Sequence, residues 1–418
     1  MGRFKILLLA LLCLTAADMA KADVIEQIVS YDLPKKGYSI YVDGNIVYLA
    51  GDTLDLQIVD VTDPYYPQLL GTVDTLTNSR GEHIYASKNI AAVAQGYGGL
   101  TICDVSDPTA PFLLANYHSQ VGIAHDVIID GHFIYESLCH GLQILNIADP
   151  TDPVLMAYLQ IEHGNDFRSL CDHNQTVYLD DMEGDISIVD ISDRSNPQLQ
   201  SAYELPTFVS WECCIGDGYG YALCCAVGIE IFDIRDPGNP HHESTIQIDL
   251  DIRRIHYYQH YIFTVGQLSG VWHLLIYNVY DPQNPRLVLD FQTSYATDLF
   301  VADDLLFCAR GRNLDIYQFN PTAIDPANPA PTAFMVAPNY PNPFNASTTI
   351  SYSLPEPATV TLEIYDILGR RVQTLYPGEQ VAGKHSYIWQ ANDFSSGTYI
   401  YSITAGESRQ SAKMILIK

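Results

Sequence analysis

The apolar positions of this chain alternate with polar ones in short runs, and most of these runs end at a proline. In residues 56–67 (LQIVDVTDPYYP), Leu56 and Ile58 flank Gln57, and Asp63 and Pro64 follow. An alternation with a period of two predicts a β-strand with one face buried. Proline favours a turn and donates no hydrogen bond to a β-ladder, and the aspartate before it can accept one from the backbone ahead. The pattern therefore predicts a strand that ends in a capped turn.

Seven copies of this run are spread over most of the chain. The later copies begin at residues 100, 142, 186, 229, 274 and 314, and the last is truncated. The fifth residues of the seven copies are Asp60, Asp104, Asn146, Asp190, Asp233, Asn278 and Gln318. The successive steps between them are 44, 42, 44, 43, 45 and 40 residues. A period near 43 residues built from short β-type runs is typical of a β-propeller with four strands in each blade. We therefore expect an all-β fold with a seven-bladed β-propeller over residues 23–320.

Each repeat predicts an innermost strand, a hairpin turn, a second strand, a loop and then the repeated strand. In the third repeat these strands are expected at residues 126–129, 133–138 and 142–147. The sixth repeat is the least regular, with a longer loop expected over residues 267–273. The run after the turn is missing from the seventh repeat, but residues 23–33 resemble it. We expect this N-terminal strand to complete the last blade and close the ring, which removes exposed sheet edges.

The aspartates repeated at the ends of these strands have two interpretations, namely a series of cation sites or caps for the turns. Their spacing matches no calcium-binding loop. Turn capping is therefore the interpretation that we favour.

The two ends of the chain differ from its repeats. Residues 1–22 carry Arg3 and Lys5, an apolar run over residues 6–14 and a small-residue ending (AKA), which is typical of a secretory signal peptide. That run is too short to span a membrane, and no other run is long and apolar enough, so we expect no transmembrane segment in the mature chain. Residues 321–336 form a Pro/Ala linker, and residues 337–418 predict about seven short strands in a small Ig-like β-sandwich.

The charge of the chain is concentrated in its repeats. The chain has 49 acidic and 21 basic residues. Residues 1–22 hold one acidic and three basic residues, and residues 337–418 hold six of each. Residues 23–336 therefore hold 42 acidic and 12 basic residues. A surface with this charge of −30 repels nucleic acid and anionic lipid. We therefore expect no nucleic-acid partner and favour a protein or a glycan.

The repeats resemble a known family. The LQIVDVTDP-type strand, preceded by a run such as residues 46–50 (IVYLA), is similar to the LVIVD repeat of secreted and surface bacterial propellers, and the resemblance covers residues 24–320. It implies an architecture and an extracellular location, but no reaction.

The C-terminal segment resembles the type A C-terminal sorting domain of the type IX secretion pathway. Its motifs stand in the family order, as NYPNPFN (residues 339–345), IYDILGRRV (364–372), SGTYIY (396–401) and KMILIK (413–418). The resemblance implies that this domain directs passage across an outer membrane through the secretion machinery, and that it is removed or anchored afterwards.

Motifs of catalysis are missing from the sequence. It has no G-x-S-x-G elbow, H-E-x-x-H helix, phosphate loop or dinucleotide fingerprint, and we expect no cofactor. Eight cysteines remain after Cys13, an even number that permits disulfides in an exported chain. A tight turn at residues 217–218 would set Cys214 opposite Tyr221 and not opposite Cys224. We favour buried free thiols over disulfides.

The start of each innermost strand supplies the candidate site. Because these strands line the central channel, seven residue pairs should meet at one mouth, together with the loops at residues 96–99, 139–141, 267–270 and 310–313. The pairs are Tyr38-Ser39, Glu82-His83, His125-Asp126, Arg168-Ser169, Trp211-Glu212, Arg253-Arg254 and Thr297-Asp298. Arginine, histidine, carboxylate and tryptophan side chains at a concave mouth are what a polar-ligand site needs. The candidate ligand-binding residues are Glu82, His83, His125, Asp126, Arg168, Trp211, Glu212, Arg253, Arg254, Asp298 and Arg310.

Other interpretations of these residues stay open. The side chains could instead bond between blades and hold the ring together. His83, His125, His140 and His163 would lie near the same mouth and imidazoles suit zinc, but their spacing is not that of a finger or ribbon, and we predict no metal site. Glu82, Asp126 and Glu212 could act as acid and base on a saccharide.

The sequence thus favours an exported β-propeller that presents an extracellular or cell-surface binding site for a protein or a glycan. The alternatives are an extracellular hydrolase or lyase acting on a saccharide at the channel mouth, and a purely structural surface protein. An enzymatic role is left undecided, with binding preferred.

Overall fold

The computed structural model forms two compact units, Met1–Pro321 and Thr322–Lys418, and each is considered by itself. The structure describes residues 24–51, 55–74, 81–87, 89–119, 122–162, 166–207, 210–321, 334–337, 339, 342–345, 347–355, 358–380, 383–391, 394–406 and 408–417. The expected signal peptide, most of the expected linker and His163 lie outside these residues. The domain boundaries at residues 22 and 336 stay predictions.

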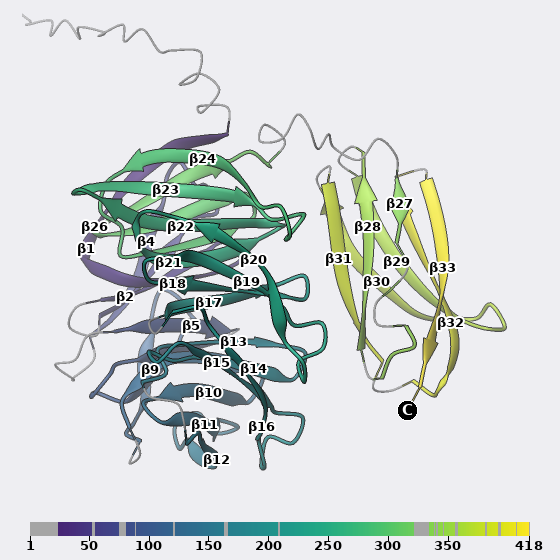
Figure 1. Ribbon diagram of the computed structural model, residues 1–418, viewed down its shortest axis with the longest axis horizontal. Coiled ribbons are helices and arrows are strands. Elements are labelled where there is room, and N and C mark those ends of the chain that lie inside the picture. Colours follow the sequence, from purple (N-terminus) through teal and green to yellow (C-terminus); the bar gives the residue numbers. More distant parts are fainter. Residues whose placement is uncertain are drawn as a thin grey trace, which may run out of the picture. The chain divides into compact units, whose positions relative to one another are not determined.

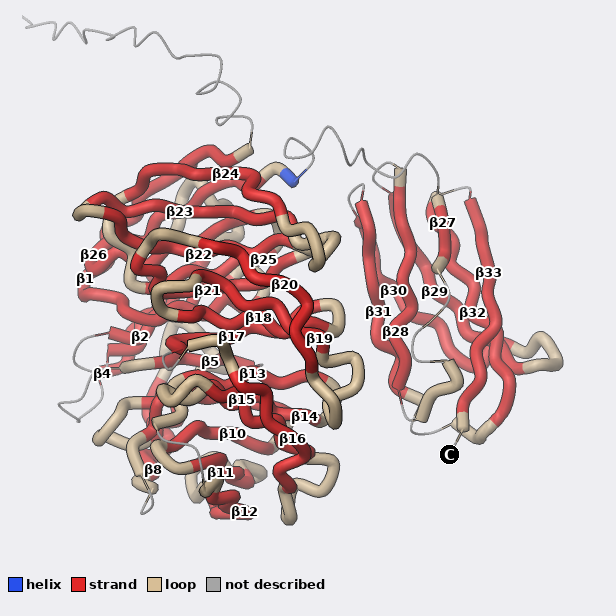
Figure 2. The backbone as a smooth tube through the Cα atoms, in the orientation of Figure 1, coloured by secondary structure: helices blue, strands red, loops and turns tan. Residues whose placement is uncertain are grey.

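The first unit is a seven-bladed β-propeller. Figures 1 and 2 show its strands grouped in consecutive sheets, with loops as short connections. Blades two to six are separate four-stranded sheets, each made of four consecutive strands. Blade two contains β5 (His83–Ser87), β6 (Ile90–Ala94), β7 (Leu100–Asp104) and β8 (Phe112–Tyr117); blade three contains β9 (Ala124–Asp130), β10 (Phe133–Leu138), β11 (Gly141–Asn146) and β12 (Val154–Gln160); and blade four contains β13 (Ser169–His173), β14 (Thr176–Asp180), β15 (Asp185–Asp190) and β16 (Gln198–Glu204). Blade five contains β17 (Ser210–Gly216), β18 (Tyr219–Cys224), β19 (Gly228–Asp233) and β20 (His241–Gln247), and blade six contains β21 (Asp251–Tyr258), β22 (Tyr261–Leu268), β23 (Val271–Asn278) and β24 (Arg286–Thr293).

The first and last blades share one six-stranded sheet. Its strands are β25 (Asp298–Ala302), β26 (Leu305–Phe319), β1 (Ile25–Asp43), β2 (Ile46–Gly51), β3 (Asp55–Asp60) and β4 (Gln68–Asp74). β26 folds back on itself, so that its two ends lie side by side. The amide of Phe319 at its end donates a 2.8 Å hydrogen bond to the carbonyl of Asp304, just before its start. The first half of β1 pairs with β26 and its second half pairs with β2.

Ring closure rests on this N-terminal strand. Residues 25–32 of β1 run antiparallel to the end of β26, with Ile25 opposite Phe319 and Asp32 opposite Asn313. The register shifts between Asp32 and Gly37, where the chain leaves the last blade and becomes the innermost strand of the first. The chain's own beginning therefore supplies the outermost strand of the seventh blade.

The repeated strands are buried on both faces, so the expectation of a single buried face was wrong. Their polar positions are as inaccessible as the apolar ones, with exposed fractions of 0% for Gln57, 1% for Gln143 and 2% for Glu230. Each blade lies between two neighbours, and the cores combine residues from adjacent blades, such as Ile188 with Phe232. A buried polar group is costly unless it is hydrogen-bonded, and Gln143 Nε2 donates to Glu136 on the next strand at 2.6 Å.

Hydrogen bonds confirm that the repeated aspartates cap turns. Asp60 Oδ1 accepts from the amide of Thr62 at 2.8 Å, and Asp63 Oδ1 accepts from the amide of Tyr65 at 3.1 Å. The equivalent bonds in the next five repeats are made by Asp104 and Asp107, Asn146 and Asp149, Asp190 and Asp193, Asp233 and Asp236, and Asn278 and Asp281.

Blade six differs from the expectation of a long loop. The strands β22 and β23 continue in register to Leu268 opposite Val271, so only Ser269 and Gly270 form the turn. Both have positive φ angles, 51° and 86°, as a tight hairpin turn requires. The blade is therefore longer and more regular than its sequence suggested.

The second unit is a small β-sandwich of two sheets. Its strands are β27 (Met335–Val336), β28 (Ser347–Leu354) and β31 (Gly383–Gln390) in one sheet, and β30 (Arg371–Gln380), β29 (Ala358–Asp366), β32 (Gly397–Ala405) and β33 (Ser408–Leu416) in the other. Ile350 and Trp389 from the first sheet share a core with Leu362, Tyr401 and Met414 from the second. Within the described parts of the chain, the structure has no helix of the length and apolarity needed to cross a membrane.

Candidate ligand site at the channel mouth

One pocket collects the first residue of most of the seven pairs. It has a volume of about 600 Å³. We call the two residues of each pair its first and second members. Six first members line the pocket, and these are Glu82, His125, Arg168, Trp211, Arg253 and Thr297. They come from six different blades, so the convergence that the repeat predicts is present in the structure. Two second members, His83 and Arg254, line the pocket as well.

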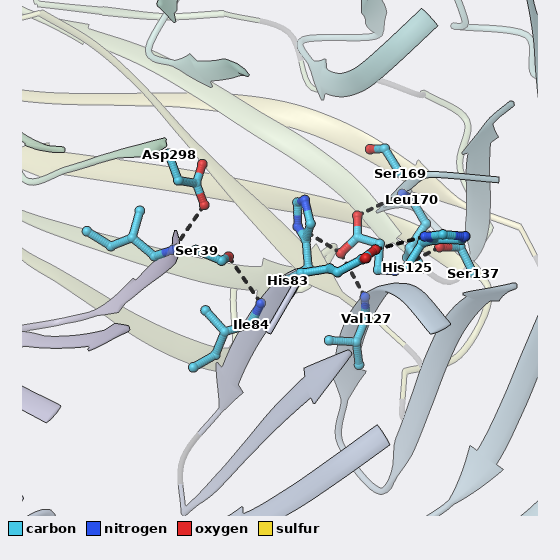
Figure 3. A network of polar contacts seen from close by, with 12 residues as sticks. Ser39, His83, Ile84, His125, Val127, Ser137, Ser169, Leu170 and Asp298 are labelled. Carbon is cyan, nitrogen blue, oxygen red and sulfur yellow. Dashed lines mark hydrogen bonds and ion pairs between the residues drawn. The ribbon is translucent and has the colours of Figure 1, made fainter. Parts of the chain in front are cut away.

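The second residue of most pairs bonds to the next blade. Ser39 Oγ accepts from the amide of Ile84 at 3.3 Å (Figure 3). Asp126 Oδ2 accepts from the amide of Leu170 at 2.9 Å. The same bond recurs from Cys213 to Ser169, from Ile255 to Glu212 and from Ile40 to Asp298. Each bond joins the innermost strands of consecutive blades. These side chains therefore hold the ring together, as the alternative interpretation of the sequence expected.

Basic side chains occupy the two remaining second positions. His83 Nδ1 lies 3.1 Å from Asp126 Oδ1, and Arg254 Nε lies 3.3 Å from Asp298 Oδ1. Burial lowers the pKa of His83, but the Asp126 carboxylate outweighs it and raises that pKa to about 9. Burial raises the pKa of Glu212 to about 7, against the opposing effect of Arg254. Each basic second member thus lies beside the acidic second member of the next blade.

Four of the candidate residues face other partners. Asp126, Glu212 and Asp298 accept the interblade hydrogen bonds, and Arg310 Nε binds Asp315 at 2.6 Å in the last blade. None of the four is among the residues lining the two pockets described here. Of the three acids considered for acid and base catalysis, Glu82 lines the pocket, whereas Asp126 and Glu212 are 6% and 8% exposed below it.

Aromatic side chains form part of the pocket wall. Trp272 and Tyr295 line it together, with their rings edge to face at 5.0 Å between centroids. On another part of the wall, the Arg168 guanidinium lies 6.0 Å from the ring of Trp211. The pocket therefore combines flat apolar faces with cationic hydrogen-bond donors.

A smaller pocket of about 430 Å³ shares Glu82, His125 and Arg168 with the first. Here His125 bonds to a carboxylate through each ring nitrogen, from Nδ1 to Glu82 at 2.8 Å and from Nε2 to Asp166 at 2.7 Å. Arg168 in turn donates to the second oxygen of Asp166 at 2.9 Å and 2.5 Å. Burial raises the pKa values of Glu82 and Asp166. The bond of Glu82 to His125, the bonds of Asp166 to Arg168 and His125, and the charge of Arg168 outweigh burial and lower both pKa values below their usual range.

The sequence did not single out several residues of these pockets. Trp272 lies two residues after the loop at residues 267–270, and Tyr295 lies two residues before the strand start at Thr297. Asp166 precedes Arg168 by two residues in a connection between blades, where the repeat carries no pattern. Its only signal in the sequence is its closeness to Arg168. His140 is exposed, and His163 lies outside the described residues.

Comparisons with known proteins agree with this architecture. A family model described as "LVIVD repeat" matches residues 36–75, 81–119, 121–159 and 177–204, and one described as "Secretion system C-terminal sorting domain" matches residues 339–418. The chain carries LVIVD repeats and a C-terminal type IX secretion sorting domain. The sorting domain indicates secretion to the cell surface or the exterior, and it implies contact with the secretion machinery. No curated protein matches the sequence significantly.

Solved structures share the fold of this propeller at low sequence identity. A computationally designed protein, Ika8, aligns with 12% identity and a TM-score of 0.52 over 71% of this chain and 100% of its own. A chain of the mitotic checkpoint complex aligns with 12% identity and a TM-score of 0.58 over 70% and 91%. PorZ, a bacterial surface component of the type IX secretion system of Porphyromonas gingivalis, aligns with 12% identity and a TM-score of 0.50 over 93% and 61%. At this identity the likeness concerns the fold alone.

Proposed function

We propose that this secreted propeller is a binding protein whose channel mouth recognises an acidic saccharide. The observation that carries the proposal is the convergence of six first members, from six blades, on one pocket of about 600 Å³. The second members make the recurring bonds to backbone amides of the next blade. Some first members also bond between blades, as His125 does with Glu82. Trp211 and Arg253 bond within their own blades and still face the common pocket, which a purely structural role does not explain.

The chemistry of the wall favours a sugar that carries a carboxylate. Arg168, Arg253 and Arg254 face the pocket, whereas residues 23–336 as a whole have 42 acidic and 12 basic residues, so cationic groups are concentrated at the pocket. Each guanidinium has five N–H donors, and the carboxylate partners of these arginines engage only some of them. Trp211 and Trp272 supply flat apolar faces against which a saccharide ring can pack.

A hydrolase at the same mouth has less support. Acid and base catalysis on a saccharide needs two carboxyl groups that flank the bond to be cleaved. Asp126 and Glu212 bond to backbone amides of the neighbouring blade instead, so Glu82 is the one acid of the three candidates at the pocket wall.

Titration of the secreted protein with acidic and neutral oligosaccharides tests the proposal. We expect a uronic-acid oligosaccharide to raise the melting temperature, since a ligand that binds only the folded state stabilises it. Trp211→Ala and Arg253→Ala should each weaken its binding about tenfold or more, the loss expected for residues at the centre of an interface. Arg286→Ala is the matched control, because Arg286 is exposed on the outermost strand of the blade that carries Arg253.

Two results would contradict the proposal. The first is a wild-type protein whose melting temperature does not change with any acidic saccharide at millimolar concentration. The second is binding that Arg286→Ala weakens as much as Arg253→Ala, which would place the ligand on the general surface. Binding of a peptide in place of a saccharide would keep the mouth as a site but reject the ligand class.

A further inference from the structure

Three side chains at the channel mouth lie within reach of a single ion. His125 begins β9 after Ala124, Cys139 follows β10, and Asp166 lies in the connection to β13. The distances are 2.7 Å from His125 Nε2 to Asp166 Oδ1, 3.8 Å from Cys139 Sγ to His125 Nε2 and 3.7 Å from Cys139 Sγ to Asp166 Oδ1. Their separation in the sequence matches no zinc-binding motif, so only the fold brings them together.

We propose that His125 Nε2, Cys139 Sγ and Asp166 Oδ1 form a zinc-binding site. Zinc holds sulfur at about 2.3 Å and nitrogen or oxygen at about 2.0–2.2 Å in tetrahedral geometry, which sets ligand atoms roughly 3.4–3.6 Å apart. Both distances from Cys139 Sγ are close to this range. The nitrogen and oxygen atoms are at hydrogen-bond distance and need to separate by roughly 0.7 Å when the ion takes the place of the proton between them.

The neighbouring side chains already orient the three ligands. Glu82 bonds His125 through Nδ1 at 2.8 Å, which leaves Nε2 directed at the site. Arg168 bonds Asp166 through Oδ2, which leaves Oδ1 directed at the same point. A carboxylate on the far nitrogen of a metal-bound histidine is the usual support for such a ligand.

The backbone holds Cys139 and Asp166 together. The amide of Asp166 donates a 2.6 Å hydrogen bond to the carbonyl of Cys139. Asp166 adopts a left-handed conformation with a φ of 61°, which is uncommon for a residue other than glycine. His125 is buried, with a side chain 6% exposed, and its ring lies between the carboxylates of Glu82 and Asp166. Two of the ligands thus share a local backbone contact, and the third is buried and held by its bonds to these carboxylates.

Charge and donor type favour zinc over calcium or magnesium. A Cys139 thiolate, Asp166 and Glu82 bring three negative charges, which Arg168 and a divalent ion balance. Thiolate and imidazole donors suit zinc, whereas calcium and magnesium prefer sets of oxygen ligands. Three protein ligands leave a fourth position, and His125 and Asp166 both line the pocket of about 430 Å³ toward which it would open.

Metal binding by the whole secreted protein tests this site directly. The protein is stripped with a chelator and titrated with Zn²⁺, and the bound metal is measured by equilibrium dialysis and atomic absorption. We expect one zinc ion per chain, with affinity reduced about 100-fold or more in Cys139→Ser. Glu82→Gln should reduce it by about 10–100-fold, the loss typical for a residue that supports a ligand. Titration with Co²⁺ should give a sulfur-to-cobalt charge-transfer band that Cys139→Ser abolishes.

Cys225→Ser is the matched control. Cys225 follows β18 in blade five as Cys139 follows β10 in blade three, but its sulfur lies 2.7 Å from Trp211 Nε1 and not beside an imidazole and a carboxylate. This variant should bind zinc like the wild type. Circular dichroism and melting temperature verify that each variant is folded. If Cys139→Ser does not fold, His125→Gln replaces it as the variant that removes a zinc ligand.

Three outcomes would overturn the assignment: a wild-type protein that retains no zinc, an equal affinity in Cys139→Ser, or an equal loss in Cys225→Ser. The assignment does not rest on saccharide binding. His125 is common to both sites, but the saccharide proposal is tested at Trp211 and Arg253, which are not among the three ligands, so failure of one proposal leaves the other standing.

Discussion

The carboxylate of Asp298, in the last blade, accepts a 2.9 Å hydrogen bond from the backbone amide of Ile40, in the first. The two residues are 258 positions apart in the chain, yet their bond repeats the one that Asp126 makes with Leu170 between consecutive blades. The ring therefore closes twice at this seam, once through the β1 and β26 pairing and once through Asp298. Asp298 also lies beside Arg254, whose charge it helps to balance.

Asp298→Ala should destabilise the propeller more than a typical surface substitution. The change leaves the Ile40 amide unpaired and removes a partner of Arg254, so we expect a loss of about 3 kcal/mol in the free energy of unfolding. Denaturant unfolding of the propeller measures it. Asp249→Ala, at an exposed position, should change the value by less than about 0.5 kcal/mol. A similar small effect for Asp298→Ala would show that the seam does not depend on this bond.

The ring could be derived from the sequence because its signals are local and repeated. The turn at Asp63 and Pro64 recurs often enough to fix both the period and the number of blades. The seventh repeat lacks its last strand, and residues 23–33 form an extra strand before the first repeat. The extra strand is therefore expected to fill the missing position. The sequence did not predict which residue of each pair lines the pocket and which bonds to the next blade. A pair such as His125-Asp126 does not indicate which of its side chains faces the channel.

Other features depend on contacts that no repeat records. Gln143 resembles a solvent-facing strand position, but the neighbouring blade covers it and Glu136 bonds it. Ser269 and Gly270 close a tight hairpin where a loop was expected. Asp166 reaches His125 from a connection of irregular backbone, so its part in the smaller pocket follows only from the folded chain.

Glu136→Gln should stabilise the protein at alkaline pH. Glu136 is fully buried, and burial raises the pKa of its carboxyl to about 8 although its bond with Gln143 opposes the shift. Because the folded pKa lies above the unfolded value of about 4.5, the protonated form is favoured on folding, and stability falls as the pH rises from about 4.5 to about 8. We expect equal melting temperatures for the two proteins near pH 5 and a higher one for Glu136→Gln at pH 9.

The exposed Glu204 offers a control for this substitution. Glu204→Gln should leave the melting temperature unchanged at both pH values. Equal destabilisation by Glu136→Gln at pH 5 and pH 9 would mean that lost packing, and not the buried charge, decides the result.

His83 gives a second pH dependence that a single substitution isolates. Its pKa is about 9 in the folded protein, since the attraction of Asp126 exceeds the effect of burial. The stability that it contributes is complete below its unfolded pKa of about 6.5 and is lost as the pH rises through about 9. In ligand-free protein, His83→Gln should therefore reduce the fall in unfolding free energy between pH 6.5 and pH 9.5 by roughly 1–3 kcal/mol. Parallel pH profiles for the two proteins would reject this pairing.

Thiol accessibility tests the arrangement of the cysteines. All eight cysteines described are free thiols; Cys103, Cys213, Cys224 and Cys308 are buried, and burial raises the pKa of Cys103 to about 12. We expect a thiol reagent to modify Cys139 and Cys225 in the native protein before any buried thiol, because the reactive form is an accessible thiolate. Mass spectrometry of the digested protein identifies the modified residues.

The same reagent under denaturing conditions without reductant distinguishes free thiols from disulfides. A protein lacking residues 1–22 should show eight reactive thiols. Cys171 and Cys213, in adjacent blades, have sulfur atoms 3.4 Å apart, so they are the pair expected to join if the exported chain is oxidised. A count of six with both of these residues protected would replace the free-thiol state by one interblade disulfide. Protection of Cys214 together with Cys224 would contradict the strand register, which sets Cys214 opposite Tyr221.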